Sequence, residues 1–493
     1  MLIGGRTGSG GAAANGSFSF DTGNLVASGV TVGLRSAGTA TGGITGILTL
    51  GGGTVTIGSG GLSVGRSTSP TTTFSTAGTV NITGGTVNIG QTGGTSVTLG
   101  SSTVAAVPAT ASLDITGGTV TLAGDLIKGT ASGTVTSTLA LNGASAILNM
   151  GGNHVTGLTA VTFANGTLRN LGILNTGMAL AGTGSRVFDQ EVGVTGSIQG
   201  AIAGPGVGLT KQGSGTLTLS GINTYTGDTT VNAGTFVLSD NARLDFVIGT
   251  TSGTNNRITG AGTVTLNGDF NIDTSLTDAA ALTTGSWTIV DAATLTETFG
   301  TTFTLAGPGW TEVSNVWTKT VGSKKYTFTE STGILALDPA ASYSSWINSF
   351  FPGETNLSII GADADPDTDG IENGVEMVIG GNPKLGMDTA LLPTLELVTN
   401  PIGSPAIAAG NYLLFTYRRS DLSVAAGVAA DCETNTALIA PWTPATGAPG
   451  VVIQVDDNFT LPPPAAAATD RVRIYVPRGA NTKLFARLKV LVP

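Results

Sequence analysis

The sequence predicts an all-β protein: a right-handed parallel β-helix, or solenoid, then a short helix with an acidic loop, then a small antiparallel β-sandwich. Glycine supplies 76 of 493 residues, and short runs of Val, Ile and Leu alternate with Thr and Ser. A period of two is typical of strands that bury one face. The low charged fraction of 11% would also fit disorder, but hydrophobic residues make up 40% of the chain and supply a core.

A Gly-Gly-Thr-Val segment recurs through the first part of the chain. Its copies begin at Gly52, Gly84 and Gly117, so they are spaced by 32 and then 33 residues. A strand-like run precedes each copy, and paired glycines permit a sharp corner between two strands. A fixed period of about 30 residues indicates a solenoid whose coils stack on one another. We therefore assign residues 1–195 to Gly/Thr-rich β-helix repeats.

Residues 209–238 carry a second and more specific pattern. Leu217 and Leu219 alternate with threonine, and short strand-like runs follow at 229–231 and 235–238. Glycine-containing turns separate these runs. Three short strands with tight corners correspond to one coil of a solenoid or more.

The residue pattern of this segment resembles that of a known family. Gly-Thr-Leu-Thr-Leu at 215–219, Asn-Thr-Tyr-Thr-Gly at 223–227 and Val-Asn-Ala-Gly-Thr at 231–235 resemble the autotransporter-associated β-strand repeat of bacterial surface proteins. The resemblance is close over residues 196–240 and loose over 44–338. It implies a right-handed parallel β-helix passenger that is secreted or held at the bacterial cell surface.

The amino-acid composition of the chain changes near Asp338. Residues 196–338 end in aromatic-rich strands that we interpret as the last coils and a cap, because a solenoid must cover its open end. Charged residues number 28 among residues 1–338 but 24 among the 155 residues 339–493. This rise in charge predicts a domain boundary.

Two further regions follow this boundary. In residues 340–384, Tyr343, Trp346 and Phe350 share one face of a helix, which Pro352 ends. Residues 385–493 return to alternating runs separated by proline-rich turns, and this predicts the β-sandwich module. The expected strands are 394–398, 412–417, 451–455, 471–476 and 484–490.

The acidic loop has the pattern of a calcium site. Aspartates at positions 1, 3 and 5, Gly370 at position 6 and glutamate at position 12 match the twelve-residue calcium loop. The predicted Ca²⁺ ligands are Asp365, Asp367, Asp369, Ile371 through its carbonyl, Asn373 and Glu376. The apolar residue lies at position 7, whereas paired EF-hands usually have it at position 8. The alternative interpretation is a solvated acidic turn.

The last two regions together also resemble a known module. An aromatic helix, a calcium loop and strands such as Phe415–Arg419 and Phe485–Leu488 are similar to a module at the ends of large secreted proteins of Verrucomicrobia-like bacteria. The loop itself resembles those of secreted bacterial modules and thrombospondin type 3 repeats. This resemblance implies a secreted protein that binds calcium.

The sequence contains only weak matches to the motifs of catalytic sites. His154 is the only histidine, so a catalytic triad or a histidine-based metal site is not expected. The Gly-x-Ser-x-Gly match at 61–65 has no following helix and is interpreted as chance. Acidic residues in the solenoid are single and scattered, whereas cleavage of a glycosidic bond needs a carboxylate pair. We therefore expect no enzyme.

Charge and hydropathy exclude other classes. The net charge of −10 without basic clusters argues against nucleic acid as a partner. The sequence contains no run of apolar residues long enough for a transmembrane helix. Residues 16–33 already resemble a coil and no signal peptide precedes them, so we expect the natural protein to begin upstream.

These observations predict a non-catalytic secreted or cell-surface protein whose solenoid is a stalk or adhesin. Its partner would be an extracellular or cell-surface glycan or protein. The alternative is a polysaccharide-active or carbohydrate-binding β-helix protein.

Overall fold

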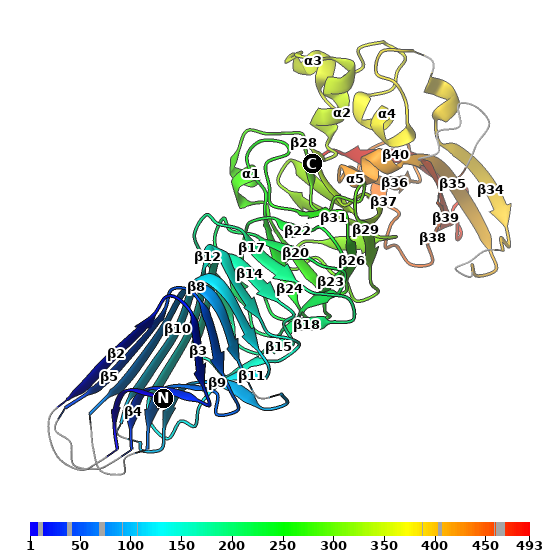
Figure 1. Ribbon diagram of the computed structural model, residues 1–493. Helices are drawn as coiled ribbons and strands as arrows, with labels where there is room; N and C mark the ends of the chain where they lie inside the picture. Colours follow the sequence, from blue (N-terminus) through cyan, green and yellow to red (C-terminus); the bar gives the residue numbers. More distant parts are fainter. Residues whose placement is uncertain are drawn as a thin grey trace. The chain divides into compact units, whose positions relative to one another are not determined.

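The computed structural model describes residues 1–7, 13–36, 42–68, 74–90, 92–105, 107–386, 388–402, 407–457, 459 and 469–493. The chain forms two compact units (Figure 1). The first comprises Met1–Lys319 and Tyr326–Leu337, and the second comprises Thr320–Lys325 and Asp338–Pro493. The predicted all-β class is confirmed: parallel sheets make up most of the first unit, and antiparallel sheets dominate the second.

Two long parallel sheets form the solenoid, and the chain passes back and forth between them from coil to coil. The first sheet has twelve strands: β1 (Leu2–Arg6), β4 (Val30–Arg35), β7 (Leu62–Ser67), β9 (Thr95–Ser102), β11 (Asp125–Lys128), β13 (Val155–Thr156), β15 (Ile173–Leu174), β18 (Thr195–Ile198), β21 (Thr216–Leu219), β23 (Thr235–Leu238), β26 (Thr263–Leu266) and β29 (Thr296–Phe299).

The second sheet has fourteen strands. Its main path is β2 (Ala14–Phe20), β5 (Ile44–Leu50), β8 (Thr76–Ile89), β10 (Ala109–Leu122), β12 (Val135–Asn149), β14 (Ala160–Arg169), β17 (Arg186–Asp189), β20 (Leu209–Gln212), β22 (Thr229–Val231) and β25 (Ile258–Gly260). Four shorter strands pair beside it: β3 (Asn24–Ala27), β6 (Thr54–Ile57), β16 (Met178–Leu180) and β19 (Ile202–Ala203).

The Gly-Gly-Thr-Val repeat marks one coil, as predicted. Val55 pairs with Val87, and Val87 pairs with Val120, in parallel register. All three side chains are buried and stack along the solenoid core. The chain does not break into two strands at the later corners, because β8 and β10 each run through their Gly-Gly pair as one strand. Register shifts next to Gly117 absorb the bend.

The last coils and their cap hold most of the aromatic side chains of the first unit. A two-stranded parallel sheet, β24 (Arg243–Val247) with β27 (Asp269–Asp273), continues the coil, and α1 (Ser275–Ala279) follows. A five-stranded sheet contains β28 (Gly285–Thr288), β33 (Ile334–Pro339), β32 (Lys324–Thr329), β31 (Val316–Val321) and β30 (Thr311–Val313), and η1 (Glu330–Thr332) joins two of its strands. Phe270 lies at the centre of the aromatic cluster, 4.7 Å from Phe246 and 4.9 Å from Phe303 between ring centroids.

The second unit contains the predicted helix and antiparallel strands. Its helices are α2 (Tyr343–Phe350), α3 (Leu357–Ile360), α4 (Asn373–Ile379), η2 (Asp388–Leu391) and α5 (Asp421–Ala425). One sheet has four strands, β34 (Thr394–Thr399), β35 (Asn411–Ser420), β39 (Thr469–Pro477) and β38 (Val452–Asp456), and the other has three, β37 (Thr443–Pro444), β36 (Ala429–Asn435) and β40 (Phe485–Leu491).

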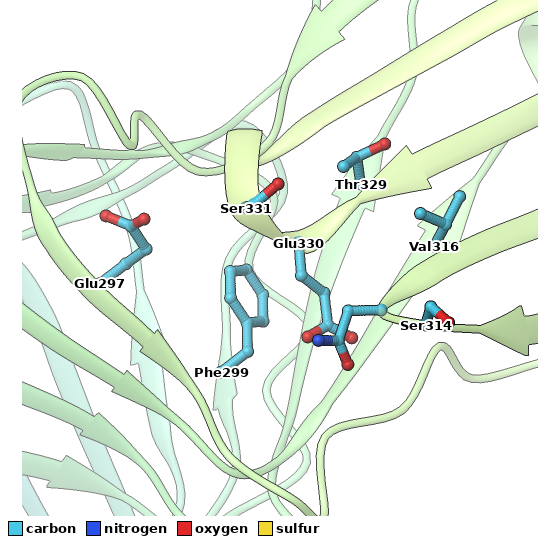
Figure 2. Close-up of a pocket in the computed structure, with 8 residues that line it drawn as sticks. Glu297, Phe299, Ser314, Val316, Thr329, Glu330 and Ser331 are labelled. Carbon is cyan, nitrogen blue, oxygen red and sulfur yellow. The ribbon is translucent and has the colours of Figure 1, made fainter.

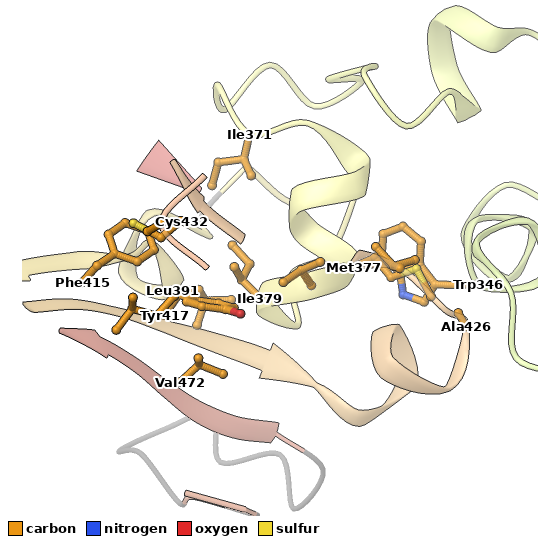
Figure 3. Close-up of a cluster of buried hydrophobic side chains, with 14 of the residues drawn as sticks. Trp346, Ile371, Met377, Ile379, Leu391, Phe415, Tyr417, Ala426, Cys432 and Val472 are labelled. Carbon is orange, nitrogen blue, oxygen red and sulfur yellow. The ribbon is translucent and has the colours of Figure 1, made fainter. Parts of the chain in front are cut away.

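The two antiparallel sheets share one hydrophobic core with α4. Phe415 of β35, Cys432 of β36 and Met377 of α4 belong to the same buried cluster (Figure 3). The sequence did not predict α5 or β36. Among the described residues, no helix is long and apolar enough to cross a bilayer.

Candidate functional site

The predicted calcium loop connects α3 to α4. Carboxylate oxygens of Asp365, Asp367 and Asp369 lie within 4.8 Å of one another. Gly370 has a φ of +89°, a conformation that glycine adopts without steric cost. The loop thus turns sharply where the sequence pattern requires it, and its three aspartates converge.

Backbone amides hold these carboxylates in place. Gly370 N–H donates to Asp365 Oδ2 at 2.9 Å, and Ile371 N–H donates to Asp369 Oδ1 at 2.9 Å. Two other oxygens, Asp365 Oδ1 and Asp367 Oδ2, are buried without a hydrogen-bond partner among the described residues. Burial and the neighbouring carboxylates Asp369 and Asp365 raise the pKa of Asp367. The loop therefore offers converging hard oxygen atoms, the donor chemistry that Ca²⁺ prefers.

The other predicted ligands lie around this group. The Ile371 side chain is buried in the hydrophobic core (Figure 3), so only its backbone is available to the loop. Glu376 lies on α4 and is fully buried, but it is outside the group of mutually close carboxylates found among the described residues. Asn373 Nδ2 donates to the carbonyls of Ile359 and Gly361 at 2.8 and 2.9 Å. The amide nitrogen of Asn373 thus anchors the end of α3, and its Oδ1 is buried without a hydrogen-bond partner among the described residues.

A second acidic group lies in the same unit and was missed by sequence reasoning. Carboxylate oxygens of Asp421, Asp457 and Asp470 also lie within 4.8 Å of one another. Arg419 forms an ion pair with Asp470 at 2.7 Å, which offsets part of the negative charge. These aspartates are far apart in the chain, so no local sequence pattern predicts that they form a group.

The weak catalytic patterns have structural roles. His154 Nδ1 accepts a hydrogen bond from Ile173 N–H at 2.9 Å, which ties one coil to the next. Ser63 lies within the parallel strand β7 and pairs with Thr31 and Thr98. It is therefore not at a strand-to-helix turn, which a nucleophile elbow requires.

Lys211, inside the repeat pattern, is a buried cation. Its Nζ donates to the carbonyls of Gln212, Gly213 and Ala233 at 2.7, 2.7 and 3.1 Å. Burial lowers the pKa of Lys211 to about 8, and the charge of Asp189 partly opposes this shift. Lys211 therefore satisfies backbone carbonyls at coil corners, a structural use of a charged residue.

Two of the cavities formed by the described residues lie in the last coils and cap of the first unit. One has a volume of about 310 Å³ and is lined by Glu297, Phe299 and Glu330 among others (Figure 2). The other, of about 240 Å³, is lined by Trp310, Asp273 and Lys319 among others. Their linings come from separate strands and turns, so sequence patterns alone do not reveal them.

Comparisons with known proteins match two parts of this description. Residues 209–238, which span β20 to β23, match the family model of the passenger-associated-transport-repeat. A segment of 101 residues, 20% of this chain, is 44% identical to the Adhesin BmaC autotransporter of Brucella suis biovar 1 (strain 1330). The chain spans 3% of the length of that adhesin. No solved structure matched the chain.

The matched repeat forms two stacked coils of the solenoid. Leu217 pairs with Phe236 and Leu219 with Leu238, and all four side chains are fully buried. The family match thus coincides with a continuous parallel β-helix. These findings support a β-solenoid that is secreted or located at the cell surface of a bacterium.

Proposed function

We propose that this chain is part of a non-catalytic bacterial surface protein in which the solenoid acts as a stalk and adhesive face. The passenger-associated repeat carries the proposal, because it lies within an uninterrupted stack of coils from β18 to β29. The likeness to one segment of an adhesin agrees with it.

The outward face of the solenoid suits adhesion. Thr216 pairs with Thr235, Thr235 with Thr263, and Thr263 with Thr296, so a row of hydroxyl groups runs across four coils. Hydroxyl groups both donate and accept hydrogen bonds. A regular polar row can therefore bind glycans or protein backbones without a deep cavity.

The proposal is tested with the purified chain coupled to beads. We expect bead adhesion to surfaces coated with cell-surface glycans or extracellular proteins, and no release of reducing ends or unsaturated uronates from pectin, alginate or xylan. Beads that carry an unrelated acidic protein control for nonspecific adhesion. Polysaccharide cleavage by the pure chain, or adhesion no better than the control, contradicts the proposal.

Carbohydrate binding is a second candidate, and the smaller cavity favours it. Trp310 offers an aromatic face, while Asp273 and Lys319 add polar groups beside it. The Lys319 ammonium already lies over the Trp310 ring, 5.7 Å from its centroid. Trp310→Ala should weaken sugar binding on a glycan array. The matched control is Trp442→Ala, because Trp442 belongs to the second unit and does not line this cavity.

We also propose that Ca²⁺ binds the loop 365–376 and stabilises the second unit. Asp365, Asp367, Asp369 and the Ile371 carbonyl would supply oxygen ligands. Glu376 would complete the set, and Asn373 would contribute through Oδ1 or through water. The support comes from the converging aspartates and the two buried carboxylate oxygens that have no hydrogen-bond partner among the described residues. When bound, the ion offsets the repulsion among these acidic groups.

Thermal unfolding of the full chain in Ca²⁺ and in EDTA tests this site. An ion that binds only the folded state at a hundredfold excess over its Kd stabilises that state by about 2.7 kcal/mol. Asp367→Asn with Asp369→Asn should remove the Ca²⁺-dependent rise in melting temperature. The matched control is Asp421→Asn with Asp457→Asn in the second acidic group. An unchanged melting temperature on adding EDTA contradicts calcium binding.

A further inference from the structure

The larger cavity of the first unit lies where the twelve-stranded sheet ends. Its wall includes Glu297 and Phe299 of β29, the terminal strand of that sheet (Figure 2). The turn between β30 and β31, at Ser314 and Asn315, and the start of η1 form other parts of the lining. The cavity has a volume of about 310 Å³, which is enough for a small organic group.

Glu297 occupies a position that belongs to the core in the preceding coils. It pairs with Val264, and Val264 pairs with Phe236, in parallel register. Both of those side chains are fully buried. Paired residues of parallel strands project from the same face of a sheet, so the Glu297 side chain projects inward at the last coil. The column of apolar side chains thus ends in a carboxylate.

A second carboxylate is held in the same cavity. Trp317 Nε1 donates to Glu330 Oε1 at 2.8 Å, and Glu330 N–H donates to the Asn315 carbonyl at 3.1 Å. Burial raises the pKa of Glu330, the Trp317 hydrogen bond opposes this, and the charge of Glu312 adds to it. None of the described residues that line the cavity is basic. A cation bound here would offset this concentration of negative charge.

The geometry favours an organic cation over a metal ion. Among the described residues, Glu297, Glu312 and Glu330 do not form a group whose carboxylate oxygens lie within 4.8 Å of one another. A metal ion needs ligand oxygens that converge at bonding distance. The Phe299 ring instead supplies an apolar wall, which suits the alkyl stem of an amine, and aromatic faces attract ammonium groups.

We propose that this cavity binds a primary alkylammonium group, presented by a lysine side chain of a partner protein or by a free amine. Glu330 pairs with the ammonium group, Glu297 adds a negative charge to the cavity wall, and Phe299 packs against the carbon chain of the amine. This proposal names the chemical group that the cap recognises. The identity of the partner rests on the proposed adhesin role.

Titration of the full chain with small amines tests the proposal. The probes are N-acetyl-lysine methylamide and its uncharged analogue N-acetyl-norleucine methylamide, with spermidine and glucosamine as free amines. Intrinsic tryptophan fluorescence and calorimetry report binding. We expect the lysine compound to bind and the norleucine compound not to bind, and we expect weaker binding at high salt. Preference for lysine over both free amines identifies a protein partner as the source of the amine, and the reverse order identifies a free amine.

Three variants and one control locate the site. Glu330→Gln should weaken lysine binding by about tenfold or more, because it removes a charge-assisted hydrogen bond. Glu297→Gln should weaken lysine binding less, because it removes only a nearby negative charge. Glu396→Gln makes the same charge change at an exposed position of β34 and should leave binding unchanged. Circular dichroism confirms that each variant is folded, and Glu330→Asp provides a conservative second variant, with reduced but measurable binding.

The outcomes separate a binding role from a structural one. An inward carboxylate on a terminal strand can simply prevent strand pairing with other chains. In that case Glu297→Gln alters association or melting temperature but not amine affinity, and the proposal is wrong. Equal binding of the lysine and norleucine compounds, or no binding of any amine, also overturns it. Failure of amine binding leaves the adhesin proposal standing, since bead adhesion is measured separately.

Discussion

Replacing Gly118 by alanine tests how tightly the Gly-Gly corners of the solenoid stack. Gly118 has a φ of +75°, and a Cβ atom there would lie 2.5 Å from the carbonyl oxygen of Gly85 in the neighbouring coil. Gly23 has a similar φ of +84°, but a Cβ atom there would meet no atom of the described residues within 4 Å. Gly23→Ala therefore measures backbone strain alone, whereas Gly118→Ala adds a clash with backbone.

The structure sets the expected magnitudes. A left-handed alanine costs about 1–2 kcal/mol, and the reduced entropy of the unfolded chain returns about 0.4–1 kcal/mol. Gly23→Ala should thus lower the free energy of unfolding by about 1 kcal/mol. Overpacking against fixed neighbours costs a further ~1–3 kcal/mol, so Gly118→Ala should lower it by about 2–4 kcal/mol.

Urea unfolding followed by circular dichroism, together with hydrogen exchange of the coils around β10, measures both variants. The Gly118 variant should unfold at a lower urea concentration, and its extra exchange should centre on β8, β10 and β12. Equal losses in the two variants would refute the stacking argument. A neutral Gly118→Ala would refute the left-handed corner itself.

Three further predictions follow from buried groups. The lowered pKa of Lys211, about 8 against an ordinary value of 10.5, means that the unfolded chain binds more protons between these values. The contribution of Lys211 to the free energy of unfolding therefore rises with pH above about 8 and falls as the pH drops through that value. Urea unfolding between about pH 8 and pH 9 measures this rise, and Lys211→Met should flatten it. An unchanged pH profile in the variant counts against the buried lysine. Phe270→Ala removes the central ring of the aromatic cluster in the cap. Chemical denaturation should show a free energy of unfolding that is lower by about 3–5 kcal/mol. A loss below about 1 kcal/mol contradicts the close packing of this ring. Burial and the charges of Asp431 and Glu433 raise the pKa of the Cys432 thiol to about 12, so a maleimide should label it only after unfolding, and rapid labelling of the native chain argues against this core.

Local patterns in the sequence determine much of the fold. The spacing of the Gly-Gly-Thr-Val segments predicts the coil length, because each coil repeats the same strand and corner chemistry. The aromatic spacing that begins at Tyr343 predicts α2, and Ser342 caps this helix. The aspartates of the acidic loop converge because a twelve-residue segment contains its own turn. In each case the residues that act together are neighbours in the chain.

Only the tertiary structure decides which distant residues meet. Glu297 and Glu330 share a cavity because the end of the twelve-stranded sheet and the cap come together there. Two antiparallel sheets share a core with α4, although nothing in the alternating runs indicates a helix within that core. In the sequence, Lys211 is an ordinary polar residue inside the repeat pattern. In the structure, the next coil stacks on it, so that Lys211 is buried and its Nζ donates to the Ala233 carbonyl. A strand pattern specifies which face is buried, whereas the partner that buries it is chosen by long-range packing.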